Sequence, residues 1–427
     1  MLDDARDVED TQGTAAPRDP IGVKESAYET EFDYSSPGYL DIIGRSLLHK
    51  GNNVRLKRAI EKAKQGNPVV IAYIGGSITH GAGAAPIHLR SYAYRSYDRF
   101  KEMFAPSDGS CIQLVKAGLG GTPSELGVIR YERDVLGEGS IQPDIVIIEF
   151  AVNDADDETR GNCYESLVLK ALSADNKPAV ILLFSVFEND WNLQDRLSPV
   201  GLHYDLPMVS MKDALVEQFR KTKGEGNVVS KEQYFHDIYH PTNLGHQMMA
   251  DALGHLLDVV DRSELDPNDH DLSKPPLIGD DFVRVQLLDR KNADLVARID
   301  HGSFGHTDAD LQMAEMHDHD YATPIFPNNW MNTGENPGEA KSFKLHLRCK
   351  RLLIIFKDSG SDEFGTARIK VDGVFVKQAD PHEVNWTRCH AMLLINEKHV
   401  SEHRVEIEMA DGHEDKRFTI LGFGYVD

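Results

Sequence analysis

The chain has 427 residues, of which 41% are hydrophobic and 27% charged, and its formal net charge is −23. This length is sufficient for two domains, each large enough to fold around its own core without a metal or disulfide. The strong negative charge argues against nucleic acid and against a membrane as partners, because phosphate backbones and anionic lipids repel such a surface. It favours a neutral or cationic substrate.

Residues 1–36 are acidic and polar and show no clear period, so we expect an N-terminal arm. They contain no apolar stretch typical of a secretion signal, and no run in the chain approaches the ~20 apolar residues of a membrane span. The sequence as it stands therefore favours a cytoplasmic protein, and a secreted one would require a signal removed earlier. Whether the chain forms a homo-oligomer stays open.

Residues 37–265 alternate between strand-like and helical segments. The short apolar runs predicted as buried strands are Pro68 to Ile74, Ile112 to Ala117, Asp144 to Phe150 and Ala179 to Phe187, with a fifth starting at Val209 to Met211. The predicted helices are Asn53 to Gln65, Tyr92 to Phe104, Ser124 to Leu136, Thr159 to Ser173 and Thr242 to Val260. This alternation predicts an α/β fold with a parallel sheet sandwiched by helices, whose ligands bind beyond the carboxyl ends of the strands.

The texture changes after a polar segment that carries three prolines, Asp266 to Pro276, which we interpret as a linker. Residues 277–427 contain alternating strand patterns instead. Ile369 to Val376 reads as a hairpin around Asp372 and Gly373, and Arg351 to Asp358 as a further strand. Because long amphipathic helical patterns are absent here, we expect a C-terminal all-β sandwich of the jelly-roll type, resembling carbohydrate-binding domains.

Cysteine and histidine patterns do not predict a metal site. The four cysteines are Cys111, Cys163, Cys349 and Cys389. They lack CxxC or zinc spacing, so we expect free thiols, with a pair between the last two as the alternative. A group of histidines among acids, His306, His317 and His319, could bind a cation, but a solvated polar loop is the default interpretation.

The first segment with chemical potential is YIGGSITHGAG, Tyr73 to Gly83, which runs directly out of a predicted strand. Its glycines would let the backbone turn sharply and expose Ser77 at the edge of the sheet, where neighbouring N–H groups can face an oxyanion. A simple turn with a capping serine is the plainer interpretation. A phosphate-binding loop is the other, although the GxxxxGK[ST] and GxGxxG patterns are both missing.

The next two strands are followed by similar polar turns. Gly120 and Gly121 lie in KAGLGGTPSELG, where the backbone can approach a ligand closely, and Asn153 lies in EFAVNDADD. The side-chain N–H₂ of Asn153 could serve as an oxyanion donor. Taken alone, a βα turn for the first segment and an Asx turn or helix cap for the second are the plainer interpretations.

The last such segment is FHDIYHPTNLGH, in which Asp237 and His240 stand three residues apart before a long helix. A carboxylate there can accept the imidazole N–H and stabilise the imidazolium that forms in catalysis. The alternative is a surface loop. His236 and His246 compete for the role of base, but neither has an aspartate three residues before it.

Together the four segments fall in the order Ser, Gly, Asn and Asp-x-x-His, and in this respect the chain resembles the SGNH hydrolases, also called GDSL esterases. The resemblance covers roughly residues 65 to 262 and implies a flavodoxin-like sheet, a Ser77–His240–Asp237 triad, and an oxyanion hole made by Ser77, Gly121 and Asn153. Gly76 stands where the GDSL form has aspartate, as in the GGSIT-type variants found among carbohydrate-directed members. No metal or organic cofactor is implied.

The second domain narrows the expected substrate. An SGNH domain beside a β sandwich resembles the two-domain carbohydrate acetylesterases, notably acetylxylan esterases of carbohydrate esterase family 2. In those enzymes the β domain precedes the catalytic one, whereas here it follows, so the resemblance supports the mechanism more strongly than the substrate. We therefore expect a serine esterase that removes acetyl groups from xylan or xylo-oligosaccharides through an acyl-enzyme. The alternatives are a lipid or thioester hydrolase, and a carbohydrate-binding protein with a relic hydrolase domain.

Aromatic residues could line the site for the sugar, because their rings stack on sugar faces. The chain has three tryptophans, at positions 191, 330 and 386. Trp191 follows the fourth predicted strand and Trp330 lies in the polar segment PNNWMN, so these two are the candidates for substrate binding, with core packing as the alternative for all three.

Overall fold

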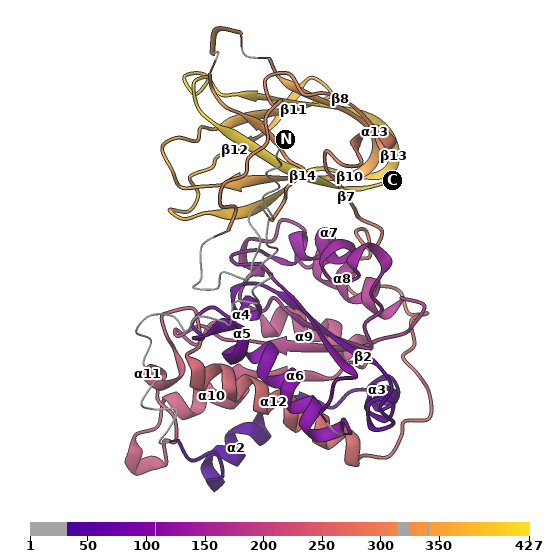
Figure 1. Cartoon of the computed structure of the whole chain (residues 1–427), viewed down its shortest axis with the longest axis vertical. Coiled ribbons are helices and arrows are strands. Elements are labelled where there is room, and N and C mark those ends of the chain that lie inside the picture. Colours follow the sequence, from indigo (N-terminus) through magenta and orange to yellow (C-terminus); the bar gives the residue numbers. More distant parts are fainter. Residues whose placement is uncertain (1–31, 107, 314–324, 336, 340) are drawn as a thin grey trace, which may run out of the picture.

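The computed structural model describes residues 32–427 except 107, 314–324, 336 and 340. Most of the predicted N-terminal arm therefore lies outside the described residues. Figure 1 shows an α/β domain in indigo to pink and, above it, an antiparallel β sandwich in orange and yellow. The predicted fold class is confirmed.

The α/β domain is built on a six-stranded sheet with the order β1-β6-β5-β4-β2-β3. Its strands are β1 (Leu47–His49), β2 (Val69–Gly75), β3 (Ile112–Gly118), β4 (Ile145–Glu149), β5 (Ala179–Phe184) and β6 (Met208–Ser210). All neighbours pair in parallel except β1, which runs antiparallel to β6. The order of the five parallel strands is that of the flavodoxin-like fold.

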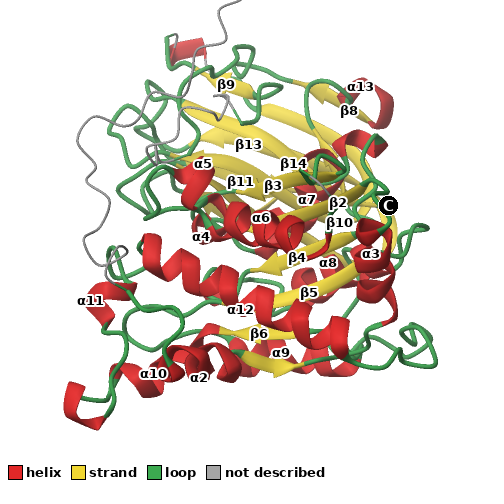
Figure 2. Ribbon diagram, turned by 60° about the horizontal axis from the view of Figure 1, so that its bottom comes forward, coloured by secondary structure: helices red, strands yellow, loops and turns green. Residues whose placement is uncertain are grey.

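Helices cover both faces of this sheet (Figure 2), which explains why β4 and β5 are buried along their whole length. One core lies under α2 (Pro37–Arg45), α3 (Val54–Lys64), α6 (Tyr92–Phe104), α10 (Met211–Phe219) and α12 (Asn243–Arg262). The other lies under α7 (Ser124–Asp134), α8 (Asn162–Leu172) and α9 (Gln194–His203). Single turns occupy the loops: α4 (Ser77–His80), α5 (Ile87–Arg90), α11 (Lys231–Tyr234) and the 3₁₀ segments Gly137–Gly139, Asp154–Asp156 and Lys223–Glu225.

Every strand and helix expected in this domain is present, with ends that shift by a few residues. The prediction of Ala179 to Phe187 as strand is too long, because β5 ends at Phe184 and the chain then turns toward the site. The helices α2, α9 and α10 and the short edge strand β1 were not expected. Of these, α9 contains Pro199. Proline usually breaks a helix, so the sequence did not predict one here.

The sandwich consists of β7 (Gln286–Leu288), β8 (Ala297–Asp300), β9 (Trp330–Asn332), β10 (Phe343–Asp358), β11 (Ala367–Val371), β12 (Val374–Ala379), β13 (Arg388–Met409) and β14 (Phe418–Val426), with the short turns α13 (Ala293–Val296) and Pro337–Glu339. The two long strands take part in both layers. The first half of β10 pairs with β8 and the end of β13, and its second half pairs with β14 and the start of β13. The predicted hairpin is confirmed: Val371 pairs with Val374, and Asp372 and Gly373 both have positive φ.

The segment predicted as a linker is bound to the α/β domain. The Asp266 N–H donates to Asn53, and Asp269 pairs with the buried Arg55 at 2.7 Å. Directly after it, the Glu165 carboxylate accepts the N–H groups of residues 277, 278 and 279. This segment is therefore fixed on the α/β domain and is not a free connector.

A broad apolar interface joins the domains. In β10, Leu352 and Ile354 point into the interior of the sandwich, whereas Leu353 and Ile355 join the core around α7 and α8. The approach is close: a β-carbon added at Gly424 of β14 would lie 2.5 Å from Ile129 of α7. Figure 1 shows α7 and α8 between the parallel sheet and the sandwich, so the second domain is packed onto the first.

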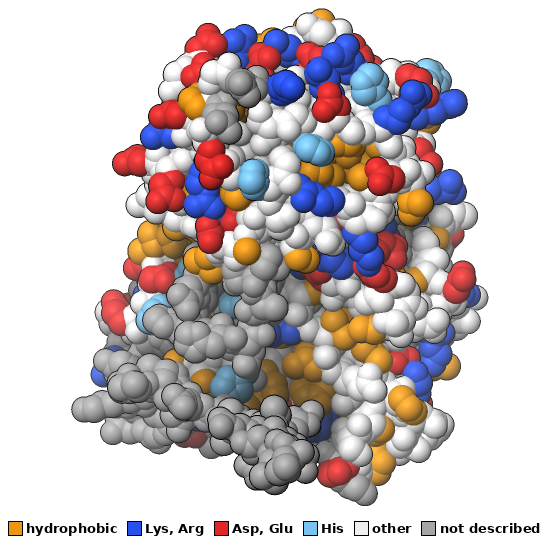
Figure 3. All heavy atoms as spheres, turned by 45° about the horizontal axis from the view of Figure 1, so that its top comes forward, with side chains coloured by type: hydrophobic (Ala, Val, Ile, Leu, Met, Phe, Trp, Pro, Cys, Tyr) orange, Lys and Arg blue, Asp and Glu red, His pale blue; other side chains and the backbone are white. Residues whose placement is uncertain are grey.

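The surface charges, the cysteines and the helix lengths of the described residues agree with what the composition predicts. Acidic and basic side chains intermingle on the face of the sandwich drawn in Figure 3, and they form no continuous basic patch there. The four cysteines are unpaired, and Cys349 and Cys389 lie in separate cores. In the described ranges, no helix has the length and apolar character needed to cross a membrane.

Candidate active site

Three of the four predicted segments meet at the carboxyl edge of the parallel sheet. Strands β3, β2 and β4 are direct neighbours, and Gly121, Ser77 and Asn153 follow their respective ends. The fourth segment, with Asp237 and His240, lies in the loop before α12. The two ends of this loop are joined by an antiparallel bridge between Phe235 and Pro241. The topology therefore brings together residues up to 163 positions apart in sequence.

A short hydrogen-bonded chain joins the three residues of the predicted triad. The Nε2 atom of His240 lies 3.0 Å from Oγ of Ser77, and its Nδ1 lies 2.8 Å from Oδ2 of Asp237. The other carboxylate oxygen of Asp237 accepts the backbone N–H groups of Tyr239 and His240. The aspartate thus fixes the loop that carries His240, and it leaves Nε2 to accept a proton from the serine.

The environment of Asp237 keeps its carboxyl ionised. Partial burial acts to raise the pKa, but the hydrogen bonds from the His240 ring and from the backbone of Tyr239 and His240 lower it to about 2. A carboxylate that stays charged down to this pH can orient and stabilise an imidazolium throughout the neutral range.

The two competing histidines do not reach the serine in this arrangement. His236 is exposed, and its backbone N–H donates to the carbonyl of His240. His246 is buried in α12, where Nδ1 accepts the N–H of Tyr92 and Nε2 donates to the carbonyl of Ala82. Burial lowers the pKa of His246 to about 3, so it is a neutral structural residue.

The turn that carries Ser77 is closely packed against the Asn153 segment. Ser77 begins α4, so its N–H has no partner within that helix. A β-carbon added at Gly76 would lie 2.3 Å from Oδ1 of Asn153 and 2.6 Å from its Nδ2. The departure from the GDSL pattern at position 76 therefore coincides with the place where the amide of Asn153 packs against the backbone.

The predicted oxyanion turn is held from below by a buried carboxylate. Asp154 accepts both the N–H and the hydroxyl of Ser124, each at 2.7 Å, and thereby links the start of α7 to the segment of Asn153. Burial and the nearby Asp157 charge raise the pKa of Asp154 to about 7. Gly121 itself has φ of 66°, a conformation that glycine adopts more readily than other residues.

The second domain covers the same turn. A β-carbon at Gly121 would lie only 2.1 Å from Cη2 of Trp386, so the indole ring packs directly on this glycine. The neighbouring Gly120 N–H donates to the sulfur of Met313 at 3.4 Å. Glu158, five positions after Asn153, accepts the N–H of Leu393 and pairs with Lys377. Residues of both domains therefore surround the candidate site.

The three tryptophans lie in different environments. Trp191 is half-buried and stacks on Phe187, which contacts Tyr239 beside His240, so it stays a candidate for the wall of the site. The prediction for Trp330 is wrong: this ring is buried inside the sandwich against Phe343 and cannot stack on a sugar. Trp386 was missed because its contact with Gly121 is made across domains and has no local sequence signal.

The predicted histidine group cannot be assembled from the described residues. His306 is exposed and bridges to Met331 through its backbone. His317 and His319 lie outside the described residues.

Comparison with known proteins agrees with this geometry. Residues 73–248 match the GDSL-like Lipase/Acylhydrolase family. The chain is similar to the crystal structure of a two-domain esterase (CEX) active on acetylated mannans, with 26% identity and a TM-score of 0.75 over 90% of this chain and 99% of that one. The same esterase co-crystallized with mannopentaose gives 26% identity and a TM-score of 0.74 over 90% and 98% of the two chains. No curated protein matches the chain.

The similarity to the two-domain esterase extends over both domains, whereas the family match lies within the α/β domain. Residues 73–248 of the α/β domain are therefore a GDSL-like lipase/acylhydrolase domain, and the chain as a whole is similar in both domains to the two-domain esterase.

Proposed function

We propose that the protein is a serine esterase that removes O-acetyl groups from a β-mannan-type or related hemicellulose oligosaccharide. The observation that carries the proposal is the position of His240, which lies 3.0 Å from the hydroxyl of Ser77 and 2.8 Å from the carboxylate of Asp237. This is the arrangement that nucleophilic ester cleavage requires of a serine, a base and an orienting acid.

In the proposed mechanism Oγ of Ser77 attacks the acetyl carbonyl while His240 takes the proton of the serine hydroxyl. The developing oxyanion is held by the N–H groups of Ser77 and Gly121 and by the amide of Asn153. His240 then donates this proton to the sugar oxygen as its bond to the acetyl carbon breaks, so the sugar leaves as a free hydroxyl and the acetyl group stays on Ser77. A water molecule deprotonated by His240 attacks this acetyl-enzyme, releases acetate and restores the serine.

The position of the second domain supports a substrate in which a small acyl group is attached to a carbohydrate. Trp386 packs on Gly121 and is 36% exposed, so it narrows the space above the turn while leaving part of the indole available to a sugar ring. The structurally similar esterase with the same two domains acts on acetylated mannans, which supports mannan over the xylan expected from the sequence.

The proposal is tested by measuring acetate release from acetylated manno-oligosaccharides, acetylated xylo-oligosaccharides and p-nitrophenyl acetate. We expect release from all three, with the highest kcat/KM for the manno-oligosaccharides. Faster cleavage of the xylo-oligosaccharides would keep the chemistry and change the substrate. Cleavage of p-nitrophenyl acetate alone, with faster cleavage of p-nitrophenyl butyrate and octanoate assayed beside it, would replace the carbohydrate assignment with a lipid or thioester hydrolase.

A further inference from the structure

Trp386 lies in the segment 380–387 between β12 and β13, and its ring packs on Gly121 of the predicted oxyanion turn. Contacts elsewhere in the sandwich must keep the segment in this position. A loop residue loses conformational freedom when it is fixed, so a ring held over Gly121 needs anchors nearby. Two residues after Trp386, β13 begins with Arg388.

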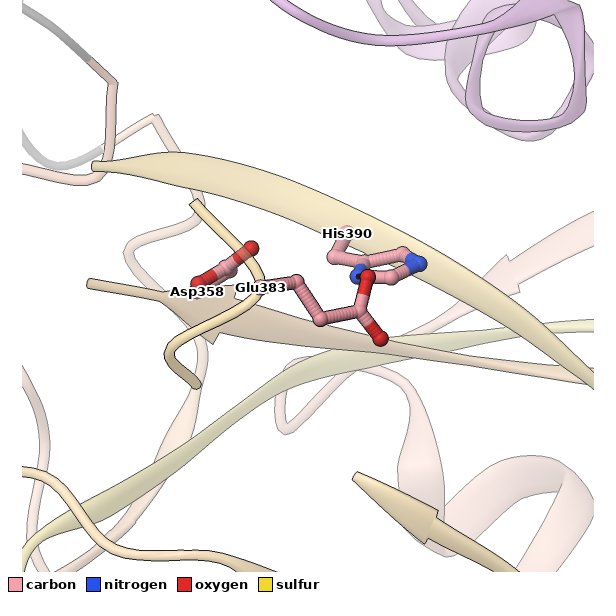
Figure 4. A group of neighbouring side chains, drawn as sticks. All are labelled: Asp358, Glu383 and His390. Atoms are coloured by element: carbon pink, nitrogen blue, oxygen red, sulfur yellow. Dashed lines mark ion pairs between the residues drawn. The ribbon is translucent and has the colours of Figure 1, made fainter. Parts of the chain in front are cut away.

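Arg388 joins three polar side chains from three parts of the sandwich. Figure 4 shows Asp358 at the end of β10, Glu383 in the loop and His390 in β13, with polar atoms within 4.8 Å of one another. The guanidinium reaches all of them: Nε lies 3.0 Å from Asp358, and Nη2 lies 3.2 Å from Glu383 and 3.4 Å from Nδ1 of His390. These three residue types can together bind a metal ion, but here the positive charge between them is that of Arg388.

The charges of the cluster depend on this arginine. The Asp358 side chain is fully buried and that of Arg388 is 20% exposed. Burial raises the pKa of Asp358, and Arg388 acts in the opposite direction. Burial and the positive charge of Arg388 lower the pKa of His390 to about 3, so the imidazole is neutral at ordinary pH. Arg388 is therefore the cation that the two carboxylates share.

The first residues of the segment 380–387 are anchored by further hydrogen bonds. The carbonyl of Pro381 accepts the N–H groups of Ser359 and Gly360, which directly follow β10. His382 bonds to Asp380 at 2.9 Å and approaches the carbonyl of Ser361 at 3.1 Å. With Glu383 bound to Arg388, the segment is fixed on both sides of Trp386.

We propose that Arg388, acting through Glu383 and Asp358, is a positioning residue that sets the location of Trp386 above Gly121 and thereby the fit of the sugar ring. The inference rests on the proposed carbohydrate esterase function and identifies what determines its substrate specificity. The side-chain partners of Arg388 are Asp358, Glu383 and His390, which belong neither to the triad nor to the oxyanion donors. Its loss should therefore act on the sugar and leave the ester chemistry in place.

The test combines Arg388→Met with Trp386→Ala in a double-mutant cycle on acetylated manno-oligosaccharides and p-nitrophenyl acetate. We expect Arg388→Met to raise KM for the oligosaccharide about tenfold while kcat/KM for p-nitrophenyl acetate changes less than about twofold. In the Trp386→Ala background the same substitution should have little further effect, because the two residues act as a unit. Arg348→Met, which removes an exposed arginine of β10, is the matched control.

Two further variants guard against a simple loss of folding. Glu383→Gln keeps the shape of the side chain and should give a smaller rise in KM, and Asp358→Asn combined with Arg388→Met leaves no buried unpaired charge. Equal effects of Arg388→Met with and without Trp386, or equal effects on both esters, would overturn the proposal.

A measurement without substrate separates this proposal from the proposed function. With Trp191→Phe and Trp330→Phe in place, Trp386 is the remaining tryptophan of the chain. We expect Arg388→Met to increase quenching of its fluorescence by acrylamide, whereas Arg348→Met should not. Unchanged quenching would refute the positioning role even in a protein that cleaves acetylated sugars, and increased quenching would support it even if the true substrate is another ester.

Discussion

The side-chain amide of Asn153 packs directly on the backbone of Gly76, so that a β-carbon at position 76 would lie 2.3 Å from its Oδ1. Ser77 follows Gly76 directly, and thus the glycine adjoins both the proposed nucleophile and a proposed oxyanion donor. The small size of residue 76 is therefore needed for the placement of the amide.

This contact predicts that Gly76→Ala acts through Asn153. Asn153→Ala should lower kcat for p-nitrophenyl acetate by about 10²- to 10³-fold, the usual effect of removing one oxyanion donor. Gly76→Ala should cause a loss of similar size by displacing the amide, and the double variant should be little worse than either single one. Losses that multiply would show that Gly76 serves the turn independently of Asn153.

Asp237→Asn should retain the fold but lose most of the activity. An amide cannot stabilise the imidazolium as a carboxylate does and favours the wrong tautomer of His240, so we expect kcat to fall by about 10³- to 10⁴-fold. Initial rates with p-nitrophenyl acetate and thermal unfolding curves of both proteins provide the measurement. A loss below tenfold would mean that another group orients His240.

Gly121→Ala tests the contact between the domains. The new methyl group would overlap the indole of Trp386 and would also sit on a backbone with positive φ, which costs roughly 1–2 kcal/mol for a non-glycine residue. We expect a large loss of kcat that Trp386→Ala partly reverses, since it removes the overlap and leaves the backbone strain. Activity of the double variant no better than that of Gly121→Ala would contradict the packing of Trp386 on Gly121.

A buried carboxyl beneath the nucleophile turn should make stability depend on pH. Burial raises the pKa of Glu149 to about 7, although hydrogen bonds from Ser185 and Thr79 act to lower it. In the unfolded chain the pKa of this carboxyl is the ordinary 4.5 of a glutamate, so between the two pKa values the folded state binds more protons and its stability falls as the pH rises. Above pH ~7 the full cost, about 3 kcal/mol, is present.

Glu149→Gln should therefore be more stable than the wild type at about pH 8 and close to it at about pH 4. Urea unfolding at both pH values gives the free energies of unfolding. Asp154, whose pKa is raised to about the same value, contributes in the same range, so Asp154→Asn serves as the comparison variant. An equal effect of Glu149→Gln at both pH values would refute the assignment of a neutral Glu149.

Local patterns in the sequence predict most of the fold and of the site. The strands of the parallel sheet are short apolar runs, and the rule that ligands bind at their carboxyl ends correctly located Ser77, Gly121 and Asn153 at one edge. The hairpin at Asp372 and Gly373 was equally clear, because its turn type demands these residues. These features depend on neighbours in sequence or on a general rule of topology.

Features that arise from packing between distant segments could not be predicted. Trp330 and Trp386 look alike as isolated tryptophans, yet one fills the sandwich core and the other reaches Gly121 across the domain boundary. The proline-rich segment looks like a free linker, but its partners Asn53 and Arg55 lie more than two hundred positions away.

The role of Ser77 is tested by comparing acetate release from acetylated manno-oligosaccharides by the wild type and by Ser77→Ala. We predict steady release by the wild type and none above the uncatalysed rate by the variant, with unchanged thermal unfolding. Release by Ser77→Ala close to that of the wild type would contradict the account, because His240 and Asp237 would then have no nucleophile to activate.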